Sequence, residues 1–145
     1  MNATAQDAWA AGLFDGEGTI GVIRQQARSK RTGDRTFGHY VQIAVYAVHE
    51  PTLRRFQAFV AGGRIYRVVP KKGNPYFVWR SSCAAAVSVL KRLQPYLFTK
   101  IRQVALGLEA AALAASHKRG QLISREDAER LVEIATAIRH LNHPF

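Results

Sequence analysis

Cysteine is almost absent from this sequence: Cys83 is the only one in 145 residues. A single cysteine excludes an internal disulfide framework and a cysteine-rich zinc site. Apolar runs of the ~18 residues that a membrane-spanning helix needs are absent too. The first residues lack a basic region followed by an apolar stretch, so we expect no secretion signal and a cytoplasmic or organellar location.

Acidic residues are scarce relative to basic ones: 10 Asp and Glu stand against 21 Lys and Arg, giving a net charge of +11. The imbalance lies in the middle of the chain, since residues 24–102 carry 16 basic and two acidic side chains. A segment this basic is typical of proteins that bind a polyanion. No basic amphipathic helix supports an acidic membrane surface instead. We therefore expect a nucleic-acid partner, with no membrane and no small-molecule substrate.

Periodicity and turn residues predict one α+β domain over residues 1–145, with elements in the order α-β-β-α-β-β-α and two further C-terminal helices. Two capping boxes, Thr4 to Asp7 and Ser124 to Asp127, are expected to begin the first and last helices. The predicted strands cover residues 19–26, 37–49, 64–69 and 76–82. In the helix after residue 100, the positions expected to face inward are Ile101, Val104, Ala105, Leu108 and Ala112.

The second predicted strand alternates clearly between apolar and polar positions. One face carries Val41, Ile43, Val45 and Ala47, and the other carries Tyr40, Gln42, Ala44 and Tyr46. This alternation indicates a strand with one buried face and one polar, aromatic face. Four such strands predict an antiparallel sheet that helices cover on one side only. Trp79 belongs either to the core or to the polar face.

The first helix ends in an unusual run at residues 10–18, Ala-Ala-Gly-Leu-Phe-Asp-Gly-Glu-Gly. Gly12 and Gly16 lie four residues apart, and Ala8 precedes them by one turn. Because each glycine costs a helix about 1 kcal/mol relative to alanine, we expect a packing reason, such as the close approach of another helix. The alternative is a helix C-cap and one chance glycine.

Two carboxylates, Asp15 and Glu17, lie at the C-terminal end of this helix, where the helix dipole disfavours negative charge. A divalent cation or the N-terminus of a facing helix would compensate for that charge. The alternative for Glu17 is a solvated turn residue.

Residues 10–18 resemble the nine-residue signature of the LAGLIDADG homing endonucleases. Relative to that signature, the sequence has Ala10 for the first Leu, Phe14 for Ile, Gly16 for Ala and Glu17 for the second Asp. Residues 93–100, Leu-Gln-Pro-Tyr-Leu-Phe-Thr-Lys, resemble the family's second landmark, a Pro-aromatic-Leu turn that ends in a core lysine. The resemblance extends over about residues 5–116 and includes the predicted order of elements.

The resemblance implies an intron-encoded, sequence-specific endonuclease that cuts both strands of a long DNA site by Mg²⁺-dependent hydrolysis. It implies that Glu17, beside the carbonyl of Gly16, binds the metal, and that Lys100 lies near the scissile phosphate. The alternative for Lys100 is a lysine that extends along apolar surface to solvent. His49, expected to end the long strand on its inward face, falls where the family often orders active-site water; a structural histidine is equally consistent. Arg54 or Arg55 would take a neighbouring basic position.

The resemblance also implies a homodimer, because the motif occurs once and two such helices form the active site. Asp15 is expected to cap a helix of the partner, and the target is expected to be nearly palindromic. The expected interface residues are Gly12, Leu13, Asp15 and Gly16. The alternative functions are an RNA maturase or a DNA-binding regulator of the same fold without cleavage, and a generic basic RNA-binding domain, which would leave the helix motif unexplained.

The polar face of the sheet is the expected DNA surface, because a two-stranded ribbon fits the major groove and its side chains can reach base edges. The expected contacts on the strands are Ile23, Gln25, Tyr40, Gln42, Tyr46, Arg64, Tyr66 and Arg67. Basic side chains in loops and turns are expected to bind DNA phosphates. Such contacts fix the position of the protein on the DNA but do not read its sequence. These side chains are Arg28, Lys30, Arg31 and Arg35. Lys71 and Lys72, at the tip of the second hairpin, complete the expected DNA contacts. The alternative is that these charges only keep the surface soluble.

Overall fold

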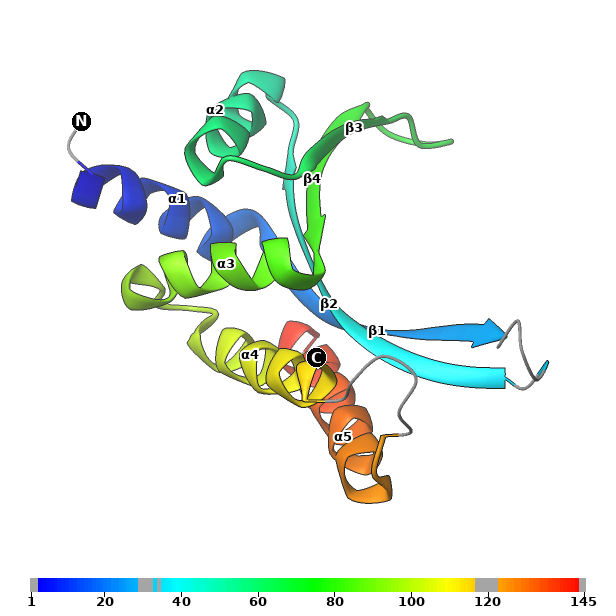
Figure 1. Cartoon of the computed structure of the whole chain (residues 1–145). Helices are drawn as coiled ribbons and strands as arrows, with labels where there is room; N and C mark the ends of the chain where they lie inside the picture. The colour runs from blue at the N-terminus through cyan, green and yellow to red at the C-terminus, as the bar shows by residue number, and fades with distance from the viewer. Residues whose placement is uncertain (1–2, 29–32, 34, 117–122, 144–145) are drawn as a thin grey trace.

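Four strands pair into one antiparallel sheet in the order β1-β2-β4-β3, and the helices lie on one side of it (Figure 1). In the computed structural model, the described residues are 3–28, 33, 35–116 and 123–143. The strands are β1 (Gly18–Arg28), β2 (Arg35–Ala47), β3 (Arg64–Val68) and β4 (Tyr76–Ser82). The helices are α1 (Ala3–Glu17), α2 (Glu50–Val60), α3 (Cys83–Leu93), the 3₁₀ helix η1 (Gln94–Tyr96), α4 (Ile101–Ala115) and α5 (Arg125–Asn142). The predicted order of elements is confirmed.

Apolar residues align across the sheet on the face that the helices cover. Ile20 pairs with Ile43 and Val22 with Val41, while Val45 lies opposite Trp79. The predicted alternation of β2 is therefore confirmed, although the strand ends at Ala47 rather than at residue 49. We call the other, uncovered surface of the sheet the open face. Figure 1 shows the β1–β2 and β3–β4 hairpins extending away from the helices and diverging from each other.

Trp79 is the largest fully buried side chain, so it belongs to the core and not to the open face. Its ring meets Phe56 of α2 edge-on at 4.8 Å between centroids, and its Nε1 donates to the carbonyl of Gly62 at 2.8 Å. A Cβ at Gly63, which has φ +84°, would overlap with the indole ring. The glycines after α2 therefore let the chain turn tightly over Trp79.

α4 packs on the sheet with a rotation that differs from the one expected. Val104 is buried as predicted, but Ile101, Ala105 and Ala112 are exposed, and the buried positions include Gly107 and Ala110. A Cβ at Gly107 would overlap with Ile20 of β1. The close approach of the helix to β1 at Gly107, where no side chain fits, therefore sets its rotation.

The two predicted capping boxes have different outcomes. In α5, the side chain of Ser124 accepts a hydrogen bond from the backbone N–H of Asp127 at 3.2 Å, as expected. In α1, the helix begins at Ala3, upstream of Thr4, so Thr4 is not its N-cap. Asn142 at the end of α5 donates to the carbonyl of Ile20 at 2.9 Å and so ties that helix to the edge strand. Among the described helices, none is long and apolar enough to cross a membrane.

Candidate functional site

The end of α1 passes into β1 without an intervening loop. A Cβ at Gly18 would overlap with both the ring and the carbonyl oxygen of the buried Phe14. Only glycine therefore fits at this sharp change from helix to strand. The result is that Asp15 and Glu17, on either side of Gly16, lie at the base of the sheet beside the start of β1.

Asp15 accepts three backbone hydrogen bonds from the segment that leads into α4. Its carboxylate oxygens bind the N–H groups of Phe98 at 2.7 Å, Thr99 at 3.1 Å and Lys100 at 3.0 Å. These N–H groups are free because η1 ends just before them and α4 begins just after them. The expected compensation of the carboxylate by a facing helix N-terminus is thus found.

The expectation that Asp15 caps a helix of the partner is wrong, because it caps α4 of its own chain. The reason is the turn through η1, which folds residues 98–100 back onto the end of α1. A hydrogen bond between residues 83 to 85 positions apart depends on tertiary structure, which the motif alone does not reveal.

Lys100 lies in the same cluster and is half-buried. Its Nζ donates to the backbone carbonyl of Asp15 at 2.6 Å, which satisfies a free carbonyl at the end of α1. Burial lowers the pKa of Lys100 from its usual value, and the negative charges of Asp15 and Glu17 act against that shift. The lysine is therefore held beside both carboxylates and does not extend freely into solvent. We call Asp15, Lys100 and the N–H groups of residues 98–100 the α1–α4 junction.

Glu17 and His49 line one shallow cavity of about 470 Å³ next to this junction. The other lining residues are Leu13, Tyr46, Ala47, Val48, Thr52 and Tyr76. The rings of Tyr46 and Tyr76 lie 6.3 Å apart and are tilted by 50°. The cavity thus combines one exposed carboxylate and one histidine with a wall of two tyrosines.

His49 is brought close to Glu17, but not from the position that we expected. It lies beyond β2, at the N-cap position of α2, and is exposed. Pro51 in the first turn starts α2 at Glu50, so the strand cannot continue to residue 49. The imidazole Nδ1 forms a 2.9 Å hydrogen bond with Oγ1 of Thr52, which fixes the ring and leaves Nε2 without a partner among the described residues.

The neighbouring arginines of α2 are engaged elsewhere. Arg54 forms an ion pair with Glu50 at 2.9 Å, and the guanidinium of Arg55 lies over the ring of Trp9 at 4.4 Å. Neither of them lines the cavity that holds Glu17.

Small residues form an exposed stripe along α1. Ala8, Gly12 and Gly16 are all exposed, and a Cβ at either glycine would have no atom within 4 Å. The fold of the single chain therefore does not require these glycines, in contrast to Gly18. Phe98, whose N–H binds Asp15 at the end of this stripe, is 87% exposed. We call Ala8, Gly12, Gly16 and Phe98 the α1 stripe.

The open face carries most of the predicted strand contacts, in rows of directly paired residues. Tyr40 lies opposite Ile23, Gly21 pairs with Gln42, and Gln42 pairs with Ser82. Further along, Tyr46, Val78 and Tyr66 form another row. Val78 is only 1% exposed on this face, between the two tyrosines. The predicted residues on this face are Ile23, Gln25, Tyr40, Gln42, Tyr46, Arg64 and Tyr66.

The predicted position of Arg67 is wrong, because this residue lies on the helix-covered side of the hairpin and not beside Arg64 and Tyr66. It pairs with Phe77, which packs against the core, whereas Arg64 pairs with Arg80. Arg80, on the open face, is missing from the predicted contacts. Because Trp79 is a core residue, alternation along β4 places Arg80 outward, so assigning Trp79 to the core in the sequence would have identified it.

The structure describes only part of the DNA contacts predicted in loops and turns. Lys71 and Lys72 are exposed in the turn between β3 and β4. Lys30 and Arg31 lie outside the described residues, as do the side chains of Arg28 and Arg35.

No protein-family model matches the sequence, and no curated protein is significantly similar to it. Solved structures do share its fold. The archaeal intron-encoded homing endonuclease I-Vdi141I, complexed with DNA, superposes with a TM-score of 0.73 at 17% identity over 97% of this chain and 86% of its own. The homing endonuclease I-CvuI, in complex with a DNA target, superposes with a TM-score of 0.70 at 19% identity, over 95% of this chain and 82% of its own.

A third solved structure, the meganuclease I-SmaMI bound to DNA, gives a TM-score of 0.71 at 13% identity over 90% of this chain but 44% of its own. Structures in the same comparison are described as LAGLIDADG meganucleases. The chain thus has the fold of the LAGLIDADG homing endonucleases, as the motifs at residues 10–18 and 93–100 predict.

Proposed function

We propose that this chain is a homodimeric, sequence-specific DNA endonuclease that hydrolyses phosphodiester bonds with Mg²⁺. The observation that carries the proposal is the α1–α4 junction. Asp15 and Lys100, 85 positions apart in the sequence, are joined by two hydrogen bonds. This contact places a carboxylate and a lysine of the two predicted motifs side by side, at the edge of a basic, uncovered sheet.

Double-stranded DNA is the substrate that suits the open face. The solved structures that share the fold include DNA complexes of I-Vdi141I and I-CvuI. In this chain, the open face presents hydrogen-bonding side chains on adjacent strands, and the turn beyond β3 carries the exposed Lys71 and Lys72. Side chains on a ribbon of this kind reach base edges in the major groove, while lysines bind phosphates.

The residues at the end of α1 suit a magnesium ion. The Glu17 carboxylate and the Gly16 carbonyl offer oxygen ligands, which Mg²⁺ prefers. Among the described residues, no cluster of three or more His, Cys, Asp or Glu side chains could hold a metal, and Glu17 is the only carboxylate among the lining residues of the cavity at the end of α1. When bound, the metal would activate water and stabilise the attacking and leaving oxygens.

The remaining groups around Glu17 have roles that follow from their contacts. Lys100, held at the Asp15 carbonyl, places positive charge beside the position of the scissile phosphate. His49 orders the attacking water through Nε2, because Thr52 occupies its Nδ1. Thr52 is therefore a positioning residue for His49.

A homodimer would bring two copies of Glu17 together. The α1 stripe exposes small residues that allow two helices to approach closely, and the exposed Phe98 adds apolar surface at its end. The match to I-SmaMI supports this arrangement, because this chain covers 44% of that longer chain. Two copies related by a twofold axis would recognise a nearly palindromic site.

The test is cleavage of a supercoiled plasmid. The plasmid carries the two DNA sequences that flank the gene, joined directly to each other without the gene between them. We expect linear product with Mg²⁺ and none with a chelator. Glu17→Gln serves as the inactive control and Glu126→Gln, an exposed acid of α5, as the matched active control. Specific binding without cleavage would overturn the nuclease and favour a regulator, whereas binding to RNA alone would favour a maturase.

A further inference from the structure

Two arginines face each other on the open face without any acidic neighbour in their row. Arg80 of β4 lies directly between Ala44 of β2 and Arg64 of β3, and Thr19 of β1 completes the row. Directly opposed side chains have Cβ atoms about 5 Å apart, and like charges at this distance destabilise a sheet. We call these four residues the arginine row.

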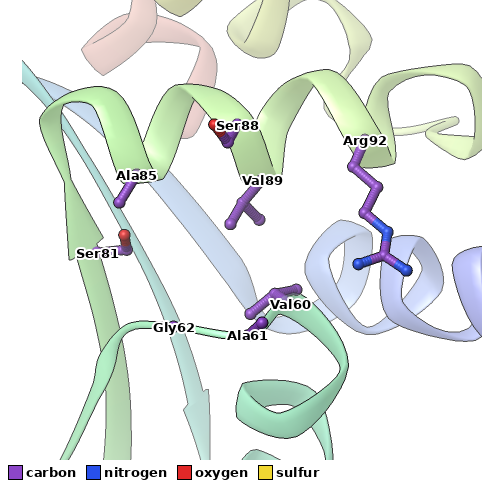
Figure 2. Close-up of a pocket in the computed structure, with 8 residues that line it drawn as sticks. All are labelled: Val60, Ala61, Gly62, Ser81, Ala85, Ser88, Val89 and Arg92. Carbon is purple, nitrogen blue, oxygen red and sulfur yellow. The ribbon is translucent and has the colours of Figure 1, made fainter.

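The side chains of Arg64 and Arg80 form no hydrogen bond or ion pair with any residue that the structure describes. Other arginines are occupied: Arg130 binds Glu109 and Glu133, and Arg92 binds Asp7 at 3.2 Å. Figure 2 shows Arg92 at one end of a cavity between α2 and α3, where its Nη1 also donates to the carbonyl of Phe59. The free guanidinium groups of the arginine row are therefore available to an external ligand.

Arg64 and Arg80 of the row line a polar recess of about 510 Å³ that extends to Ser81 and to Ala85 of α3. Its walls include Gln42, Arg64, Tyr66, Arg80 and Ser82. Ala44 beside Arg80 is small and only 4% exposed, so neighbouring side chains cover it. The recess offers hydrogen-bond donors from three adjacent strands and no carboxylate among its lining residues.

We propose that Arg80 reads a guanine in each half of the DNA target. This inference rests on the proposed function. A guanidinium donates two parallel hydrogen bonds to O6 and N7 of guanine, the most common specific contact in the major groove. Arg64 adds positive charge on the outer strand and keeps Arg80 from folding back toward β3. The arginine row thus selects a G·C pair, and does not only attract phosphates.

The register of the sheet also predicts where this guanine lies in the target. Along β1, Thr19 of the arginine row follows closely after Glu17, and Gly21, which pairs with Gln42, comes next. The arginine row is therefore nearer to the proposed cleavage centre than Gln42 is. We expect the guanine to lie within about two base pairs of the position that Gln42 contacts, on the side of the centre of the palindrome, since a strand rises about 3.4 Å per residue.

The experiment is selection of bound duplexes from a randomised DNA pool, without divalent metal so that the DNA stays intact. The wild type should enrich a palindromic sequence with a guanine in each half-site. Arg80→Ala should lower the preference for that guanine by about 10- to 100-fold and leave the other positions unchanged. Arg80→Lys should keep the overall affinity for DNA but lose the preference for guanine, because an ammonium group cannot form the two parallel hydrogen bonds.

Arg67→Ala is the matched control, since Arg67 lies in the same hairpin on the opposite face. It should leave the selected sequence unchanged. Thermal unfolding of Arg80→Ala should occur at or above the wild-type temperature, because the substitution removes a like-charge contact and no partner.

The possible failures are distinguishable. If the wild type enriches no sequence, the proposed function fails. If the wild type enriches a sequence that lacks the guanine, or if Arg80→Ala leaves the guanine preference intact, only the inference about Arg80 is overturned. That inference alone is also overturned if Arg80→Ala weakens all positions equally, or if Arg67→Ala removes the guanine.

Discussion

The α1–α4 junction and the open face are built in opposite ways. At the junction, one carboxylate of Asp15 accepts three backbone N–H groups, and Lys100 donates to the carbonyl of the same residue. On the open face, Arg64 and Arg80 lie side by side with no partner among the described side chains. Internal hydrogen bonds therefore fix Lys100 and the end of α1 that carries Glu17, whereas the recognition groups are left for an external partner.

This difference has a physical reason. A catalytic group must be held in a productive geometry before the substrate binds, which requires contacts within the protein. A recognition group forms its best hydrogen bonds only with the DNA, and an internal partner would have to be displaced first. Each of the following substitutions tests one side of the comparison.

The largest effect is expected for Glu17→Gln. The exposed carboxylate at the end of α1 forms no hydrogen bond or ion pair with the described residues, so its loss should not disturb the fold. Cleavage should fall by at least about 100-fold, while DNA affinity in a binding assay stays within a few-fold of the wild type. Cleavage by Glu17→Gln at a rate similar to that of the wild type would remove Glu17 from the active site.

Gly12→Leu should abolish both dimerisation and cleavage. A Cβ at this exposed position would meet no atom within 4 Å in the single chain, so the monomer should fold normally. The matched variant is Gly18→Ala, which should destabilise the monomer itself, because its Cβ would overlap with Phe14. Sedimentation equilibrium separates the two effects, and a monomeric wild type, even on DNA, would contradict the dimer.

The next effect concerns the stability of the junction. Asp15→Ala leaves three N–H groups without their acceptor and should lower the free energy of unfolding by about 1–3 kcal/mol, measured in urea. Asp7→Ala, on the same helix, is the control. Its single exposed contact with Arg92 should be worth at most about 1 kcal/mol. Equal losses in the two variants would mean that Asp15 does not hold the junction.

The parts of the structure that the sequence predicts are those governed by local pattern. The alternation of residues 40–47 predicts both faces of β2, and the motif at residues 10–18 predicts the end of α1. The predictions are wrong where packing between distant segments determines the orientation or the partner of a residue. α4 is rotated because Gly107 must fit against Ile20, and Asp15 caps α4 of its own chain because η1 folds back.

The site residues follow the same division. Glu17 and Lys100 each belong to a motif that the sequence reveals, but the turn through η1, which depends on tertiary structure, brings them near each other. The expected strand position of His49 is wrong because Pro51 ends that strand early, and the expected face of Arg67 is wrong in a short strand of five residues. In such a short strand, only the partner strand fixes which face a residue takes, so the error could be avoided only by first assigning Trp79 to the core.

On the open-face side, a lysine at the hairpin tip should affect affinity but not base preference. Lys71→Ala should lower the slope of log affinity against log salt concentration by about 0.9 and weaken binding to all sequences alike.

Gln42→Ala should instead relax the preference at one base pair in each half-site, by about 1–3 kcal/mol. Lys91→Ala on α3, on the helix-covered side, is the control. A change of preferred base in Lys71→Ala would reverse these roles.

The smallest effect is expected for His39, on the helix-covered face of β2 opposite Arg24. Burial, followed by the positive charge of Arg24, lowers the pKa of His39 below its usual value. The unfolded chain therefore binds a proton at a higher pH than the folded chain does, so the unfolding free energy should fall as the pH drops below 6.5 and level off below the folded pKa. His39→Asn should remove this part of the pH dependence, measured by urea unfolding between pH 7 and pH 5, whereas His143→Asn, exposed after α5, should retain it. Because His39 is only partly buried, the change should be small. An identical pH dependence in His39→Asn and the wild type would mean that folding does not lower the pKa of His39.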